Sequence, residues 1–199
     1  MRGSMVLVTG ACLVASVAAL ADDAWQAVKT TSEGIALSRR PGRTSGFHDL
    51  RLEARSSANP ERLATRVWGT FLEARPPVRQ RDFLVRGSDE IVFHDHIKVS
   101  VVSDREYTLR IRHLRDGDVH RLVFGTAPEL GPPPTDGFVT IPIVQGAWEF
   151  RPDGTGVAIT YTVYSEPGGS VPAFLVRGAQ VDEALENMRH ALALAGGGE

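Results

Sequence analysis

Cysteine is almost absent from this chain of 199 residues, because the single example, Cys12, lies in an apolar N-terminal segment. The rest of the chain therefore has no disulfide, no thiol nucleophile and no cysteine-ligated zinc site. Lysine is also scarce, occurring only as Lys29 and Lys98, and the net charge is −2. Since no basic field is present to attract phosphates, no nucleic-acid partner is expected.

Sequence signatures of catalysis are missing as well. No Gly-x-Ser-x-Gly segment marks a nucleophile, although Ser, His and Asp all occur. The segment PDGTGV, residues 152–157, precedes a strand pattern and not a helix, so it does not predict a phosphate loop. We therefore expect no catalytic residues, no enzyme activity and no cofactor.

The first 21 residues have the layout of a secretory signal peptide. MRGS carries one positive charge, an apolar run follows, and ALA at 19–21 offers a small-residue cleavage site. The apolar run is about 16 residues long, whereas a membrane-spanning helix needs ~20. We expect a signal peptide over 1–21 and a periplasmic or secreted domain over 22–199. An uncleaved N-terminal membrane anchor is the alternative.

The remaining pattern predicts one α+β domain. Helices are expected over 22–31 and 59–74, the second with Asn59 as its N-cap and Pro60 in its first turn. Strand patterns cover 34–40, 48–57, 80–87, 90–99, 106–118, 119–127, 138–152 and 156–165. Because these strands mostly follow one another directly, the sheet should be antiparallel.

A long helix should close the chain from Pro172 onward, with Ser170 as a cap and Gly168 and Gly169 permitting the sharp turn before it. Its apolar residues recur at helical spacing: Phe174, Gly178, Val181, Leu185, Met188, Leu192 and Ala195. A curved antiparallel sheet around such a helix can enclose a cavity. A solid core is the alternative that spacing alone favours.

Several stretches carry a family resemblance. VVSDREYTLRIR resembles an Arg-Asp-aromatic strand, with Glu106 in place of the usual Asp. QGAWEFRPDGTGVAITYTVYSEPGG resembles a Gly-x-Trp strand, a hairpin and a strand ending in Asp-Pro-Gly-Gly, here with Glu166 for Asp. With the closing helix, and GPPPTDG in the place of an omega loop, the chain resembles START (StAR-related lipid-transfer) domains of the helix-grip superfamily. Small secreted bacterial START proteins are the most similar group.

The resemblance implies a helix-grip fold, in which a curved antiparallel sheet wraps around the C-terminal helix, with an N-terminal helix and another between early strands. It implies one lipid, sterol or hopanoid bound in a hydrophobic tunnel, for transfer or sensing in the cell envelope. A monomer with transient membrane contact is expected. The alternative is a helix-grip cyclase or hydrolase that acts on a hydrophobic substrate in the same cavity.

The expected site has two parts. The apolar strand faces and the closing helix are expected to line the lipid cavity through Phe93, Asp95, Tyr107, Leu109, Ile111, Tyr161, Val163, Phe174, Val181, Leu185 and Met188. The omega loop is expected to act as a gate through Gly131, Pro132, Pro133, Pro134, Thr135, Asp136, Gly137 and Phe138.

Three polar residues, His94, Asp95 and His96, lie on the strand expected over 90–99. Asp95 shares strand parity with apolar residues, and a buried carboxylate needs a partner, water or a ligand head group. The family's arginine partner is absent, because Thr140 stands near its place. The nearby RDF, residues 81–83, is interpreted as a coincidental echo of the family motif. His94 and His96 have spacing compatible with a metal, but no third ligand is evident, so a solvated face and no metal requirement are expected.

Cleavage after Ala21 gives the first testable prediction. N-terminal sequencing of the protein exported by its host should read DDAWQ. Recovery of a membrane fraction that still carries Met1 would contradict it.

Overall fold

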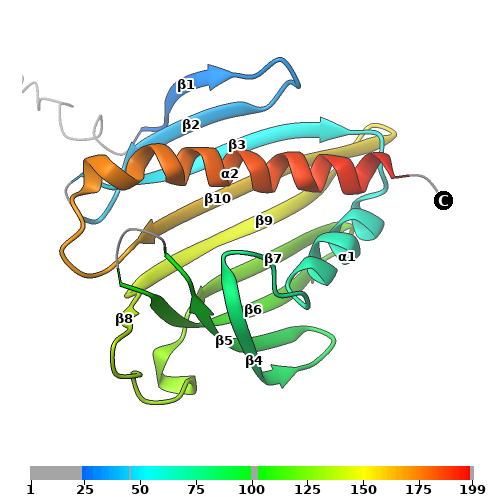
Figure 1. Cartoon of the computed structure of the whole chain (residues 1–199). Helices are drawn as coiled ribbons and strands as arrows, with labels where there is room; N and C mark the ends of the chain where they lie inside the picture. Colours follow the sequence, from blue (N-terminus) through cyan, green and yellow to red (C-terminus); the bar gives the residue numbers. More distant parts are fainter. Residues whose placement is uncertain (1–23, 45, 100–102, 198–199) are drawn as a thin grey trace, which may run out of the picture.

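The computed structural model describes residues 24–44, 46–99 and 103–197. Within them, a curved sheet wraps around a long C-terminal helix (Figure 1). The helices are α1 (Pro60–Thr70), α2 (Ala173–Gly196) and the short 3₁₀ helix η1 (Pro128–Leu130). The strands are β1 (Gln26–Thr30), β2 (Ala36–Pro41), β3 (His48–Ser56), β4 (Val78–Arg86), β5 (Glu90–Ile97), β6 (Arg105–Asp116), β7 (Val119–Thr126), β8 (Val139–Thr140), β9 (Ile143–Asp153) and β10 (Gly156–Glu166).

The ten strands form one sheet in the order β1-β2-β3-β10-β9-β7-β6-β5-β4, with β8 beside β6. Neighbours along that path are antiparallel, and only the short β8 pairs in parallel, so the expected α+β antiparallel architecture is confirmed. Helix α2 runs across the concave face, against β3 and β10, while α1 covers β7 and β9 and touches α2 (Figure 1). No helix in the described ranges is long and apolar enough to span a membrane.

Local signals placed α1 correctly. The Asn59 side chain accepts a hydrogen bond from the Arg62 N–H at 3.0 Å, and Pro60 occupies the first turn, where its missing N–H costs nothing. Leu63, Ala64 and Val67 recur on the face that packs into the core.

Two helix expectations were wrong. Gln26–Thr30, expected to be helical, forms β1, because this segment pairs with β2 and that pairing outweighs local helix propensity. The expected signal peptide lies outside the described residues. Ser170 does not cap α2: the N-cap is Pro172, which makes no side-chain hydrogen bond. The turn itself is as expected, since Gly168 and Gly169 both have positive φ angles, of 70° and 63°.

The core is centred on aromatic residues of β9 and β10. Trp148 and Tyr161 are register partners on these strands, and their rings stack with centroids 4.0 Å apart. From α2, Leu185 and Met188 reach the same core, with 2% and 0% of their surface exposed. These two residues therefore pack as core side chains and attach the helix to the sheet.

This packing predicts that Met188→Ala lowers the free energy of unfolding by about 2–5 kcal/mol, because a fully buried Met side chain leaves a cavity behind. Arg189→Ala is the matched control, since Arg189 is the next residue and is exposed, and its effect should be small. Urea denaturation measures both. If Met188→Ala loses about 1 kcal/mol or less of unfolding free energy, a loss as small as that expected for Arg189→Ala, Met188 borders open space instead.

Candidate functional site

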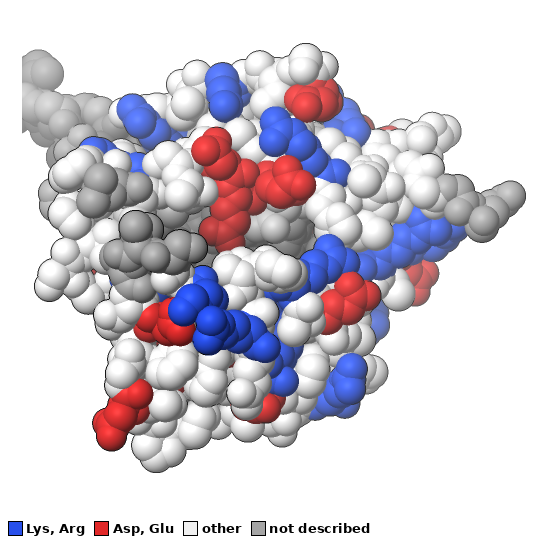
Figure 2. Space-filling view, viewed as in Figure 1, with Lys and Arg blue, Asp and Glu red and all other residues white. Residues whose placement is uncertain are grey.

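A cavity of about 310 Å³ lies between α2 and the concave face of the sheet. Strands β6, β9 and β10 supply most of its apolar wall, through Tyr107, Val144, Tyr161 and Val163, and Phe124 of β7 adds to it. A smaller space of about 160 Å³ borders it under α1 and shares Phe124, Val144, Tyr161 and Asn187 with it. Figure 2 shows the hollowed face beneath α2, with acidic side chains gathered over the helix and basic ones across the hollow.

Larger hollows occur on the outside of the molecule. One of about 690 Å³ lies at the start of α1 beside the turns that follow β6 and β9, and its lining includes Glu61, Arg62, Arg66 and Asp118. Ligand pockets for small hydrophobic molecules are predominantly apolar, so the smaller cavity under α2 is the better candidate.

Of the residues expected to line the cavity, Tyr107, Tyr161 and Val163 do so. Leu109 lines only the smaller adjoining space. The other expected residues lie elsewhere: Phe93, Ile111, Leu185 and Met188 are buried in the core, Val181 borders a separate hollow beside Arg39 and Leu50, and Phe174 is 68% exposed. From Val181 onward, the apolar stripe of the helix therefore packs against the core instead of facing the cavity, whereas its first turn, with Phe174, is exposed.

The face of α2 that does meet the cavity was missed. Its residues are Val176, Ala179, Gln180, Glu183, Ala184 and Asn187, which also recur at helical spacing. Three of them are polar and look like surface positions in the sequence. The Gln180 amide is held by donating to the Ser165 carbonyl and hydroxyl oxygens, both at 2.9 Å.

Glu183 is the ionisable group of α2 that faces this space. Its carboxylate has no hydrogen bond or ion pair with any described residue, although protein atoms surround it densely. By accessible surface Glu183 is nevertheless exposed, because the cavity that it borders is open to solvent, so the surrounding protein only partly desolvates its carboxylate. Burial raises the pKa of the Glu183 carboxyl above its ordinary value. Burial, and then the nearby Glu183 charge, also raise the pKa of Tyr161, so both groups favour their neutral forms.

Asp95 is not a cavity residue, because it forms a buried ion pair. Arg81 donates to both carboxylate oxygens, at 2.7 and 2.6 Å, and Tyr107 donates its hydroxyl at 3.2 Å. Arg81 also donates to the carbonyl oxygens of Phe71 and Glu73 just after α1, both at 2.9 Å. The RDF interpreted as coincidental therefore supplies the partner of Asp95, by the cross-strand register Arg81↔Asp95.

Comparison with solved structures finds several with the same fold, two of which are named StAR-related lipid transfer proteins. A STAR-related lipid transfer protein from Xanthomonas axonopodis superposes with a TM-score of 0.72 at 23% identity, over 86% of this chain and 98% of that one. Human StAR-related lipid transfer protein 5 gives 0.68 at 14% identity, over 86% of each chain. Human STARD10 gives 0.66 at 14% identity, over 85% of this chain and 73% of that one.

The chain has the START fold. At the level of sequence, no protein-family profile matches it. One curated relative, an uncharacterized protein of Pseudomonas aeruginosa, is 38% identical over 58 residues, a segment that spans 29% of each chain.

In this START fold the omega loop lies on the outer face of β6 and does not line the cavity. The Thr135 N–H donates to Glu106 Oε1 at 2.9 Å, and the Phe138 ring stacks on His96 with centroids 4.6 Å apart. Only Ile141, which follows β8, reaches the cavity from this side. Gating by residues 131–138 stays a prediction.

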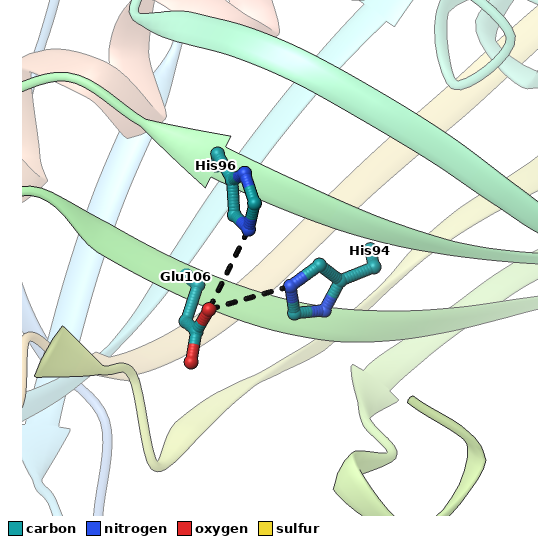
Figure 3. Close-up of side chains that lie close together, drawn as sticks. All are labelled: His94, His96 and Glu106. Atoms are coloured by element: carbon teal, nitrogen blue, oxygen red, sulfur yellow. Dashed lines mark ion pairs between the residues drawn. The ribbon is translucent and has the colours of Figure 1, made fainter. Parts of the chain in front are cut away.

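The omega loop also covers a cluster of three side chains, of which the sequence pattern indicated only His94 and His96. His94, His96 and Glu106 each direct one ligand atom toward a common point, and these atoms lie within 4.8 Å of one another (Figure 3). The expectation of a solvated face was wrong, since His94 and Glu106 are 5% and 1% exposed. Glu106 of β6 is the cross-strand register partner of His96 of β5, which residue spacing did not reveal.

Glu183 generates a prediction on pH dependence. A carboxyl whose pKa is raised on folding contributes stability below its unfolded value of 4.5, and that contribution is lost as pH rises through the folded value. Between pH 4.5 and about pH 8, wild-type stability should therefore fall by more than that of Glu183→Gln. Urea denaturation at both pH values gives the comparison.

Glu186→Gln serves as the control, because Glu186 lies one turn away on the same helix, is exposed like Glu183, and does not line the cavity. It should keep the wild-type pH dependence. Identical pH dependence in wild type and Glu183→Gln would mean that the Glu183 carboxyl is freely hydrated.

Proposed function

We propose that this protein binds a single lipid, or a similar hydrophobic small molecule, in the cavity beneath α2. The observation that carries the proposal is a partly open, mainly apolar cavity with a few converging polar groups, Gln180, Glu183 and Asn187. That combination is typical of small-molecule sites. The START fold supports the same reading, since the similar structures include lipid-transfer proteins.

The polar groups favour a ligand with an uncharged hydrogen-bonding end. A Glu183 carboxyl with a raised pKa gives no stable site for an anion when ionised, and gives a hydrogen-bond donor when protonated. A hydroxyl, or a carboxylic acid bound in its neutral form, can pair with Glu183 and Asn187 while its apolar part contacts Tyr161 and Val163. A sterol- or hopanoid-like alcohol and a fatty acid both meet this description.

The volume limits the ligand. About 310 Å³ lies at the lower end of the range for ligand pockets, roughly 300–1,000 Å³. A ligand with two long acyl chains therefore requires α2 or the corner at Glu166 to move outward, whereas a single chain or compact ring system needs less displacement. With the expected export signal at residues 1–21, we propose a monomer that carries or senses such a ligand in the cell envelope, in transient contact with membranes.

Catalysis is the second candidate, and one observation favours it. Glu183 has a raised pKa in a cavity that also holds Tyr107 and Tyr161, and a raised pKa makes a carboxyl better suited to donate a proton as a general acid. A cyclase or hydrolase would need Glu183 for turnover, whereas a carrier returns its ligand unchanged. Mass spectrometry of the ligand before and after prolonged incubation separates the two.

The binding proposal predicts that Ala179→Trp, which places an indole in the cavity, weakens ligand binding by about tenfold or more. Titration with a fluorescent fatty acid and, separately, a fluorescent sterol measures the affinity, and organic extracts of the purified protein identify any co-purified lipid. Ala193→Trp is the control, because Ala193 is exposed on α2 like Ala179 but does not line the cavity. If a folded Ala179→Trp protein binds the probes as tightly as wild type, the cavity beneath α2 is not the ligand site.

A further inference from the structure

Four buried side-chain polar atoms of the described residues lack hydrogen-bond partners; one, Arg51 Nε, lies 3.4 Å from the Glu53 carboxylate, and the other three gather at one place on the outer face of the sheet. These three are His94 Nε2, His96 Nε2 and Glu106 Oε2, and no other described residue supplies a hydrogen bond to any of them. Each imidazole nitrogen lies 3.5 Å from the same carboxylate oxygen (Figure 3). Buried polar atoms are normally satisfied, so three unsatisfied ones that converge on a point indicate a missing partner at that point.

We propose that His94, His96 and Glu106 bind a divalent transition-metal ion, with Zn²⁺ as the best-fitting ion. Two imidazole nitrogens and one carboxylate oxygen form a ligand set that zinc commonly uses, with a fourth position for water or an external ligand. The one negative charge of Glu106 partly offsets the charge of the ion in a buried setting.

The spacing of the ligand atoms fits such an ion. Bonds of roughly 2.0–2.2 Å at tetrahedral angles place neighbouring ligand atoms about 3.4 Å apart. Both nitrogen–oxygen separations are 3.5 Å, and all three atoms lie within 4.8 Å of one another. The two nitrogen–oxygen separations therefore match those of a tetrahedral site.

The surroundings orient the ligand side chains as metal sites require. His94 Nδ1 lies 3.0 Å from Thr108 Oγ1, so a proton on Nδ1 leaves Nε2 free to coordinate. Glu106 Oε1 accepts from the Thr135 N–H, which leaves Oε2 directed at the imidazoles. The loop backbone packs so closely on Thr108 that a side-chain carbon at Gly131 would overlap its hydroxyl.

Direct pairing of the carboxylate with a protonated imidazole is the competing explanation. It accounts for the arrangement less well, because neither 3.5 Å contact has hydrogen-bond geometry and a proton on one ring leaves the other nitrogen unsatisfied. An ion satisfies all three atoms together. Since Thr135 and Phe138 contact two of the ligands, the ion would also fasten the omega loop to β5 and β6.

The test uses the full-length mature protein, stripped with chelator and dialysed against Zn²⁺ or Co²⁺. We expect one ion per chain by elemental analysis, and the visible ligand-field bands of a four-coordinate Co²⁺ site. Free Zn²⁺ at about 100 times its Kd should raise the Tm by about 5–10 °C. Less than one ion per chain at saturation, or no Co²⁺ bands, would overturn the proposal in favour of the protonated pair.

Variants assign the site. His96→Gln and Glu106→Gln should each abolish stoichiometric binding, and Glu106→Gln keeps an oxygen for the Thr135 N–H. Thr108→Val should weaken Zn²⁺ binding by about tenfold or more while the ligands remain. His190→Gln, which removes a histidine distant in sequence and in a different element, should bind as wild type. Unchanged binding in folded His96→Gln and Glu106→Gln would place the ion elsewhere and overturn the assignment.

Discussion

One helix has to cover a concave sheet that is much wider than itself, and the rest of the structure depends on this mismatch. Nine strands in sequence across the sheet, at about 4.8 Å spacing, span roughly 38 Å, whereas a helix with its side chains is only about 10–12 Å across. Helix α1 covers part of the remainder over β7 and β9. The space left beside α2 becomes the cavity, because Tyr107 and Tyr161 line its wall without filling it.

The division of α2 into two faces follows from the same mismatch. Leu185 and Met188 fill the side where the helix contacts the sheet, so they fix its position and are not available to a ligand. The neighbouring face carries Gln180, Glu183 and Asn187 over open space, where polar groups keep access to water or to a ligand. A polar residue is tolerated there only because the cavity exists, since in a filled core each would need a fixed partner.

Signals contained within one element were readable from the sequence, whereas contacts between elements were not. Asn59 and Pro60 mark the start of α1 by local chemistry alone, and the two glycines at 168 and 169 mark the final turn. The pairs Arg81–Asp95 and His96–Glu106 depend on strand register, which the loop lengths alone do not reveal. The cavity face of α2 was hidden for a related reason, since helical spacing defines a stripe but not the direction it faces.

The cavity and the His94–His96–Glu106 cluster lie on opposite faces of one strand pair, and a single loop region reaches both. Alternation along β6 sends Glu106 outward and Tyr107 inward, while Thr140 lies 3.5 Å from Glu106 and Ile141 enters the cavity wall. Gly168 packs against the Thr140 carbonyl oxygen, which joins the corner before α2 to the same region.

Glu166, Pro167 and Val176 are only half-buried here, so outward movement at this end exposes less apolar surface than movement at Leu185 or Met188. Anything that fastens the loop to β6 therefore also restrains the part of the cavity wall that is least costly to open.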